Sequence, residues 1–139
     1  MDLVDIIPIG ASASRQIIVT PELTVGHVYP GLPLVYATPQ MIFLMEMAAA
    51  DVIAGLLPAG WGSVGAHVDV RHLAASAVGM QITAEARVTA VDQRTVTFAV
   101  SAHDGVESIG AGTHVRAPVE LARFVERINR KFNAQGLTA

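Results

Sequence analysis

The sequence predicts one α+β domain, spanning residues 1–139, in which an antiparallel sheet covers a long apolar helix. The length of 139 residues is typical of a single domain. A stretch that begins at Thr38 is apolar on nearly every side, as in a helix wrapped by other structure. From Ala66 to Ala117, apolar and polar residues alternate in a way typical of strands with one buried face.

The composition favours a protein that buries apolar surface against another subunit. Hydrophobic residues make up 52% of the chain and charged residues 15%, and the mean hydropathy is +0.47. These values exclude a disordered chain and are high for a soluble monomer. Glu46 and Asp51 interrupt the longest apolar stretch well short of the ~20 residues that cross a membrane. We therefore expect a homodimer, with a tetramer as the alternative, and no membrane partner.

The charged residues exclude several classes of function. Nine Lys and Arg stand against twelve Asp and Glu, and the absence of a basic block argues against nucleic acid as a partner. The absence of cysteine excludes disulfides and a thiol nucleophile. Asp2 and Asp5 stand where a secretory signal carries bases, so we expect a cytoplasmic protein.

The N-terminal quarter predicts little regular structure. The segment from Arg15 to Val25 is expected to form an edge strand that contains Pro21. Residues 26–37 hold Pro30, Gly31 and Pro33, and we expect a loop there.

The long helix has clear ends in the sequence. Thr38 before Pro39 is typical of an N-cap followed by proline at the first helical position. The helix is then expected to reach about Leu57 and to end at Pro58.

Four strands are predicted after the helix. Their expected ranges are Ala66 to Ala74, Met80 to Ala90, Arg94 to Ala102 and Val106 to Ala117. Inner faces are expected to carry the apolar residues Ala66, Val68, Val70, Ala74, Met80, Ile82, Ala84, Ala86, Val88, Ala90, Val96, Phe98, Val100 and Ala102. Asp104-Gly105 predicts a two-residue hairpin turn, and Gly110 and Gly112 predict bulges or close approaches.

The four strands are expected to form a meander whose apolar face covers the helix. A short amphipathic helix from Val119 to Phe132 closes the chain. A long central helix held in a curved antiparallel sheet is the hot-dog fold.

Two polar residues do not fit their apolar surroundings. Glu46 lies inside the apolar helix, and His72 lies on the inner face of its strand. Because the sheet packs on the helix, the two side chains are expected to meet. One interpretation is a structural ion pair or a core histidine, and the other is a carboxylate–imidazole pair that moves a proton or activates water.

Thr38 by itself is interpreted as a helix cap. It lies eight residues before Glu46, about 12 Å along a straight helix, so the two cannot flank one carbonyl carbon. Either the chain folds back near Thr38, or a shared site combines residues from two subunits. The remaining polar residues carry weaker signals: the alternating His67, Asp69 and Arg71 suit a solvated face better than a metal site, and His114 is as consistent with the surface as with a site.

Three blocks of the sequence resemble the fluoroacetyl-CoA thioesterase family of hot-dog proteins, over about residues 25–119. They are the helix from Thr38 through Glu46, the segment from Gly62-Ser63-Val64-Gly65 to His72, and Ser101 to His114 (SAHDGVESIGAGTH). The resemblance implies that Thr38, Glu46 and His72 are catalytic.

The same resemblance implies a substrate site. It places Gly65 close to the acyl group or thioester, and it places Arg116 on the family's last strand, as a substrate-binding residue. In the family member that accepts fluoroacetyl-CoA, an aromatic-rich stretch precedes the threonine. Here the corresponding stretch, from Gly31 to Tyr36, is mostly aliphatic and includes Leu32 and Leu34, which predicts a broader range of short acyl groups.

The expected function is hydrolysis of a short-chain acyl-CoA to the free acid and coenzyme A, with no metal and no cofactor beyond the coenzyme A of the substrate. Glu46 acts either as general base or as nucleophile, and the sequence leaves this open. The alternatives are a non-catalytic acyl-CoA-binding or scaffold dimer and, third, an acyl-thioester hydratase or dehydratase.

Overall fold

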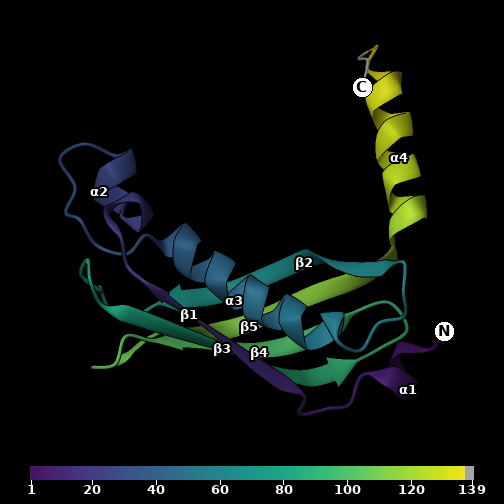
Figure 1. Cartoon of the computed structure of the whole chain (residues 1–139), viewed down its shortest axis with the longest axis horizontal. Helices are drawn as coiled ribbons and strands as arrows, with labels where there is room; N and C mark the ends of the chain where they lie inside the picture. Colours follow the sequence, from purple (N-terminus) through teal and green to yellow (C-terminus); the bar gives the residue numbers. More distant parts are fainter. Residues whose placement is uncertain (137–139) are drawn as a thin grey trace.

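The computed structural model describes residues 1–136 and confirms the hot-dog fold: a long helix lies across a curved five-stranded antiparallel sheet (Figure 1). In chain order the elements are α1 (Leu3–Ile6), β1 (Ser12–Ile18), the 3-10 turn η1 (Pro21–Leu23), α2 (Val25–Val28), α3 (Thr38–Ala54), β2 (Trp61–His72), β3 (Gln81–Val91), β4 (Val96–His103), β5 (Ser108–Glu120) and α4 (Leu121–Ala134). None of the helices within residues 1–136 is long and apolar enough to cross a membrane.

The strand order in the sheet is β1-β3-β4-β5-β2. β3, β4 and β5 form the predicted meander, but β2 pairs with β5 at the far edge and not with β3. The segment that follows β2 leads from this edge to β3, which lies next to the strand at the opposite edge of the sheet. Within this segment the Ser76 carbonyl accepts from the Tyr36 N–H at 2.9 Å. β1 is an edge strand as expected, but it ends at Ile18 because Pro21 starts the 3-10 turn.

The core lies between α3 and the inner face of the sheet. Ile82, Phe98 and Val100 are buried there as predicted, together with Met41, Met45, Ala48 and Ile53 of α3. Ala90 is exposed, contrary to prediction, because a register shift between Val88 and Ala90 changes the side to which the strand end points. Ala66 and Val68 of β2 are exposed as well, next to a second register shift between Gly65 and His67.

The β4–β5 turn is longer than predicted. Residues 104–107 connect the strands, and the Asp104 carboxylate accepts from the backbone N–H groups of Val106 and Glu107 at 3.0 Å each. The Ser76 hydroxyl donates to the same carboxylate at 2.8 Å. These hydrogen bonds hold the pKa of Asp104 below its usual range, with the Glu107 N–H as the largest contributor.

The two ends of α3 also differ from prediction. The N-cap is Ala37, so Thr38 is already the first helical residue, and the helix ends at Ala54. Within the expected loop of residues 26–37, α2 reaches to Val28 as one helical turn. The C-terminal helix α4 forms as predicted, but it extends away from the rest of the molecule (Figure 1).

Candidate active site

Thr38 and His72 are joined by a hydrogen bond of 2.7 Å between Thr38 Oγ1 and His72 Nδ1. α3 supplies the threonine at its first turn, and β2 supplies the histidine at its last residue. The Thr38 side chain makes no capping hydrogen bond, so the interpretation of this residue as a cap is wrong. A hydroxyl placed on an imidazole nitrogen is an arrangement that can transfer a proton.

The second ring nitrogen of His72, Nε2, has surroundings different from those of Nδ1. His72 Nε2 is buried and has no hydrogen-bond partner among the described residues. A buried polar atom without a partner is costly, and a catalytic role is one of the reasons for which proteins retain such an atom. An open pocket of about 500 Å³ lies directly beside the pair. It is lined by Val25, Val35, Tyr36, Ala37, Thr38, Pro39, His72, Leu73, Ala74 and Ala75.

Tyr36 is the aromatic residue of this pocket wall and stays neutral. Its hydroxyl donates to the Gln40 carbonyl at 3.1 Å. Burial raises the pKa of Tyr36 to about 12. The wall near Thr38 is therefore uncharged and mostly apolar, which suits an acyl chain.

Glu46 lies two helical turns further along α3, beside a different group of residues. Its Oε2 is 3.6 Å from Arg116 Nη1, and its side chain is 28% exposed. A Cβ at Gly65 would lie 2.8 Å from the same oxygen, so the missing side chain leaves room for the carboxylate. The Glu46 carboxylate therefore lies between the strand β2 and the buried guanidinium of Arg116.

Arg116 is fixed by three hydrogen bonds to two residues. Its Nε donates to Ser63 Oγ at 2.9 Å and its Nη2 donates to the Ser63 carbonyl at 2.9 Å. Its Nη1 donates to His114 Nε2 at 3.2 Å. Burial lowers the pKa of Arg116, and the nearby Glu46 opposes that shift.

The partners of His114 determine its tautomer. Because an arginine can only donate, His114 Nε2 must be the acceptor. The other ring nitrogen, Nδ1, is 2.8 Å from the His67 carbonyl, which can only accept, so Nδ1 carries the proton. Burial lowers the pKa of His114, the positive charge of Arg116 lowers it further, and His114 is neutral.

The predicted pair of Glu46 and His72 is not formed within one chain. The structure groups Thr38 with His72, and Glu46 with Arg116 and Gly65. Along α3, Thr38 and Glu46 are separated by about 12 Å, because the helix is regular from its first residue and does not fold back. The geometry in which the chain folds back near Thr38 is therefore wrong, and a site shared between two chains stays a prediction.

None of the four substrate-binding residues suggested by the resemblance lines this pocket. Leu32 and Leu34 are 45% and 53% exposed and lie outside it, and Gly65 and Arg116 lie beside Glu46. Val35 and Tyr36 line the pocket in place of the two leucines. Sequence reasoning missed the positioning role of His114. The signal for it was the alternation along β5, which places Gly110, Gly112, His114 and Arg116 on one face.

The neutral His114 predicts that acid destabilises the fold. The unfolded chain binds a proton at His114 as the pH falls below about 6.5, but the native protein does not, because its pKa is lower. Stability should therefore fall from pH 7.5 to pH 5.5, by at most about 1.4 kcal/mol per pH unit from this group. Urea unfolding at both pH values measures it. His114→Gln should reduce the slope and His103→Gln, at an exposed position, should keep it; equal slopes in all three proteins would contradict the prediction.

The chain is similar to known thioesterases. A family model described as fluoroacetyl-CoA-specific thioesterase (FlK) matches residues 19–122. The fluoroacetyl-CoA thioesterase of Streptantibioticus cattleyicolor is 38% identical over 129 residues, which are 88% of this chain and 93% of the relative.

Solved structures agree with this similarity. A structure of the fluoroacetyl-CoA thioesterase FlK has 38% identity and a TM-score of 0.84, and the match covers 89% of this chain and 96% of that one. A thioesterase superfamily member from Thermus thermophilus has 32% identity and a TM-score of 0.83, over 93% of this chain and 95% of that one. A hot-dog-like protein from Thermanaerovibrio acidaminovorans, at 24% identity and a TM-score of 0.87 over 95% and 98% of the chains, supports the fold alone.

Proposed function

This chain belongs to the family of fluoroacetyl-CoA-specific thioesterases, and we propose that it hydrolyses acyl-CoA thioesters with Thr38, His72 and Glu46 as its catalytic residues. The observation that carries the site is the 2.7 Å hydrogen bond between Thr38 and His72 at the edge of a mostly apolar pocket. The reaction adds water to the thioester carbonyl carbon, breaks the carbon–sulfur bond and releases the free acid and coenzyme A. A thiol leaving group with a pKa of about 8.5 needs little help from a general acid.

The Thr38–His72 pair supports two related roles. His72 can take the Thr38 proton while the hydroxyl oxygen attacks, or Thr38 can orient a water molecule from which the proton is removed. In both cases an imidazole nitrogen of His72 accepts the proton. Glu46 is the carboxylate of the proposed site, as general base or as nucleophile.

We infer that the complete site needs two copies of the chain. β2 forms one edge of the sheet, and its residues 65–69 are exposed. Antiparallel pairing of two β2 strands about a twofold axis between Val68 and Asp69 places Gly65 opposite His72 of the partner subunit. Glu46 lies against Gly65, so its carboxylate then approaches the Thr38–His72 pair of the other copy. The proposed enzyme is a homodimer with two such sites, and we expect it to act on acyl-CoA in the cytoplasm.

The pocket walls support short, apolar acyl groups. Val25, Val35 and Ala74 offer aliphatic contact, and one methylene in such a pocket changes discrimination by only ~1–3 kcal/mol. Arg116 is only 4% exposed and lies beside Glu46, a position that suits the acyl end of the substrate rather than the phosphates of coenzyme A. We therefore propose a short-chain enzyme with a broader range than fluoroacetyl-CoA.

Release of free thiol from a panel of acyl-CoAs tests this function. Because the chain has no cysteine, a thiol-specific reagent reports only the coenzyme A that is released. We expect turnover of acetyl-, fluoroacetyl-, propionyl- and butyryl-CoA, unaffected by EDTA and without added cofactor, and no comparable turnover of palmitoyl-CoA. The absence of thiol release from the whole panel would contradict the proposal and favour a binding or scaffold dimer, and hydration of an enoyl-CoA without thiol release would favour a hydratase.

A further inference from the structure

A second pocket lies behind one wall of the first pocket, the one that borders the Thr38–His72 pair. It has a volume of about 200 Å³ and lies between α3, β1 and η1. Its one charged lining residue, Arg15, is held by Asp51 at 2.6 Å, so the second pocket suits an apolar ligand better than an anion. The catalytic steps proposed above make no use of this space. Its apolar lining comes from Ile17, Leu23, Phe43, Leu44 and Met47.

Tyr36 separates the two pockets. It is the only described residue that lines both of them. Its hydroxyl donates to the Gln40 carbonyl at 3.1 Å, and Gln40 lines the second pocket. The Tyr36 residue is only 2% exposed, so neither pocket leaves open space around the ring. The ring therefore closes the passage from the first pocket to the second.

Tyr36 is held in place along its backbone and at its hydroxyl. Its N–H donates to the Ser76 carbonyl at 2.9 Å, and the N–H of the next residue, Ala37, donates to the Leu23 carbonyl at 2.9 Å. A ring that swung aside would give up the hydrogen bond to Gln40, and a buried hydroxyl without a partner is costly. The wall between the pockets is therefore rigid.

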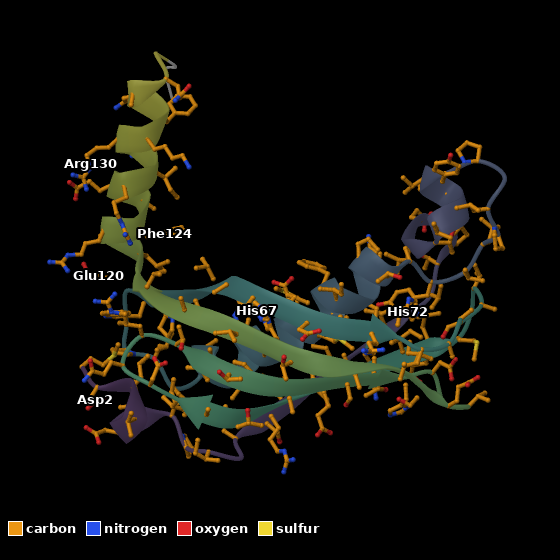
Figure 2. All side chains as sticks on the ribbon, turned by 180° about the vertical axis from the view of Figure 1, so that it is seen from behind. Asp2, His67, His72, Glu120, Phe124 and Arg130 are labelled. Atoms are coloured by element: carbon orange, nitrogen blue, oxygen red, sulfur yellow. The ribbon has the colours of Figure 1, made fainter. Side chains whose placement is uncertain are left out.

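The position of Thr38 directs an acyl group toward this wall. Tyr36 precedes Thr38 by two residues, and Figure 2 shows His72 at the end of β2 that lies nearest to α2. A thioester carbonyl carbon within reach of the Thr38 hydroxyl places the acyl chain in the first pocket, along Val35 and Ala74. An acyl chain that is extended by further methylenes then meets the Tyr36 ring.

We propose that Tyr36 is a specificity-determining residue that sets the upper limit of acyl chain length. This inference rests on the proposed function. With the ring in place, a chain that is too long must overpack against a rigid wall. Without the ring, the second pocket of about 200 Å³ continues the first and accepts the additional methylenes. A purely structural Tyr36 would affect the turnover of short and long acyl groups equally.

The acyl-length profile of thiol release tests this inference, as kcat/KM for acetyl-, butyryl-, hexanoyl- and octanoyl-CoA. We expect wild-type kcat/KM to fall at least about tenfold from butyryl- to octanoyl-CoA, the scale on which a pocket discriminates single methylenes. Tyr36→Val should raise the octanoyl-to-butyryl ratio at least about tenfold, because the second pocket then receives the end of the chain. A wild type that hydrolyses octanoyl-CoA as well as butyryl-CoA, or a Tyr36→Val ratio equal to that of wild type, would overturn the proposal.

Two matched variants isolate the ring. Tyr36→Phe removes only the hydroxyl and should keep the wild-type ratio. Met47→Ala enlarges the second pocket without opening the wall and should keep that ratio too. A ratio raised in either variant as much as in Tyr36→Val would overturn the proposal.

Circular dichroism checks that each variant is folded. If Tyr36→Val does not fold, Tyr36→Leu takes its place, because leucine keeps more of the buried volume. The Tyr36→Leu ratio should shift toward octanoyl-CoA as well, and an unchanged ratio in a folded Tyr36→Leu protein would overturn the proposal.

Binding of the same acyl-CoAs, measured by isothermal titration calorimetry, separates this inference from the proposed function. A wild type that releases thiol, with the same length profile as Tyr36→Val, refutes the role of Tyr36 and leaves the hydrolase standing. A wild type that releases no thiol refutes the hydrolase. In that case a ratio of dissociation constants that Tyr36→Val shifts about tenfold toward octanoyl-CoA still supports the role of Tyr36, and an unshifted ratio refutes both.

Discussion

Glu46→Gln is expected to keep the fold and to lower kcat/KM for acyl-CoA by at least about 100-fold, the scale of a lost general base. Glutamine has the same shape but cannot accept a proton or attack a carbonyl carbon. Its side-chain oxygen can still face Arg116, which keeps its hydrogen bonds to Ser63 and His114. We therefore expect a loss of stability of no more than about 3 kcal/mol.

Thiol release and urea unfolding, measured on the same preparation, separate the two effects. Glu85→Gln is the matched control, because Glu85 is exposed on β3. The substitution replaces the same carboxylate by the same amide away from the site. If Glu46→Gln turns over acyl-CoA like the control, the carboxylate serves only to neutralise Arg116, and the Glu46 part of the proposed site is wrong.

Thr38→Val is expected to lower kcat/KM by about 100- to 10,000-fold with little change in stability. Valine keeps the shape of threonine but removes the oxygen that lies 2.7 Å from His72 Nδ1. The helix start should tolerate the change, because Ala37 is the N-cap and the Thr38 side chain makes no capping hydrogen bond. The stability cost is that of one hydrogen bond, about 0.5–1.5 kcal/mol.

The conservative variant and the double variant test whether Thr38 and His72 act as a unit. Thr38→Ser keeps the hydroxyl and should retain most of the activity. His72→Ala should lose as much as Thr38→Val, and the double variant should lose little more than either single variant, because groups that share one proton are strongly non-additive. Losses that add in the double variant would mean that the two residues contribute independently.

Much of the fold was predictable because its signals are local. The apolar sequence of α3 and the alternation along β3, β4 and β5 report which residues face the core, and Ile82, Phe98 and Val100 are buried as expected. Glu46 and His72 were identified as residues of interest for the same reason, since each is polar on an apolar face. The ends of elements were predicted less well, as at Ile18 and Ala90, where a proline turn and a register shift intervene.

The sequence by itself determined the position of the long helix, the faces of the strands and the candidate residues. Because Thr38 and Glu46 are eight residues apart, it also determined that a straight helix keeps them about 12 Å from each other. Only the tertiary structure decided the partner of each group: Thr38 for His72, Arg116 for Glu46, and His114 for Arg116. The order β4-β5-β2 puts Arg116 beside Ser63 and Glu46, although more than 50 residues separate Ser63 from Arg116 in the chain. The periodicity of side chains along a strand or helix specifies which residues share one face of that element. Which residue a side chain contacts depends on strand order and register, and these are set by contacts between residues far apart in the sequence.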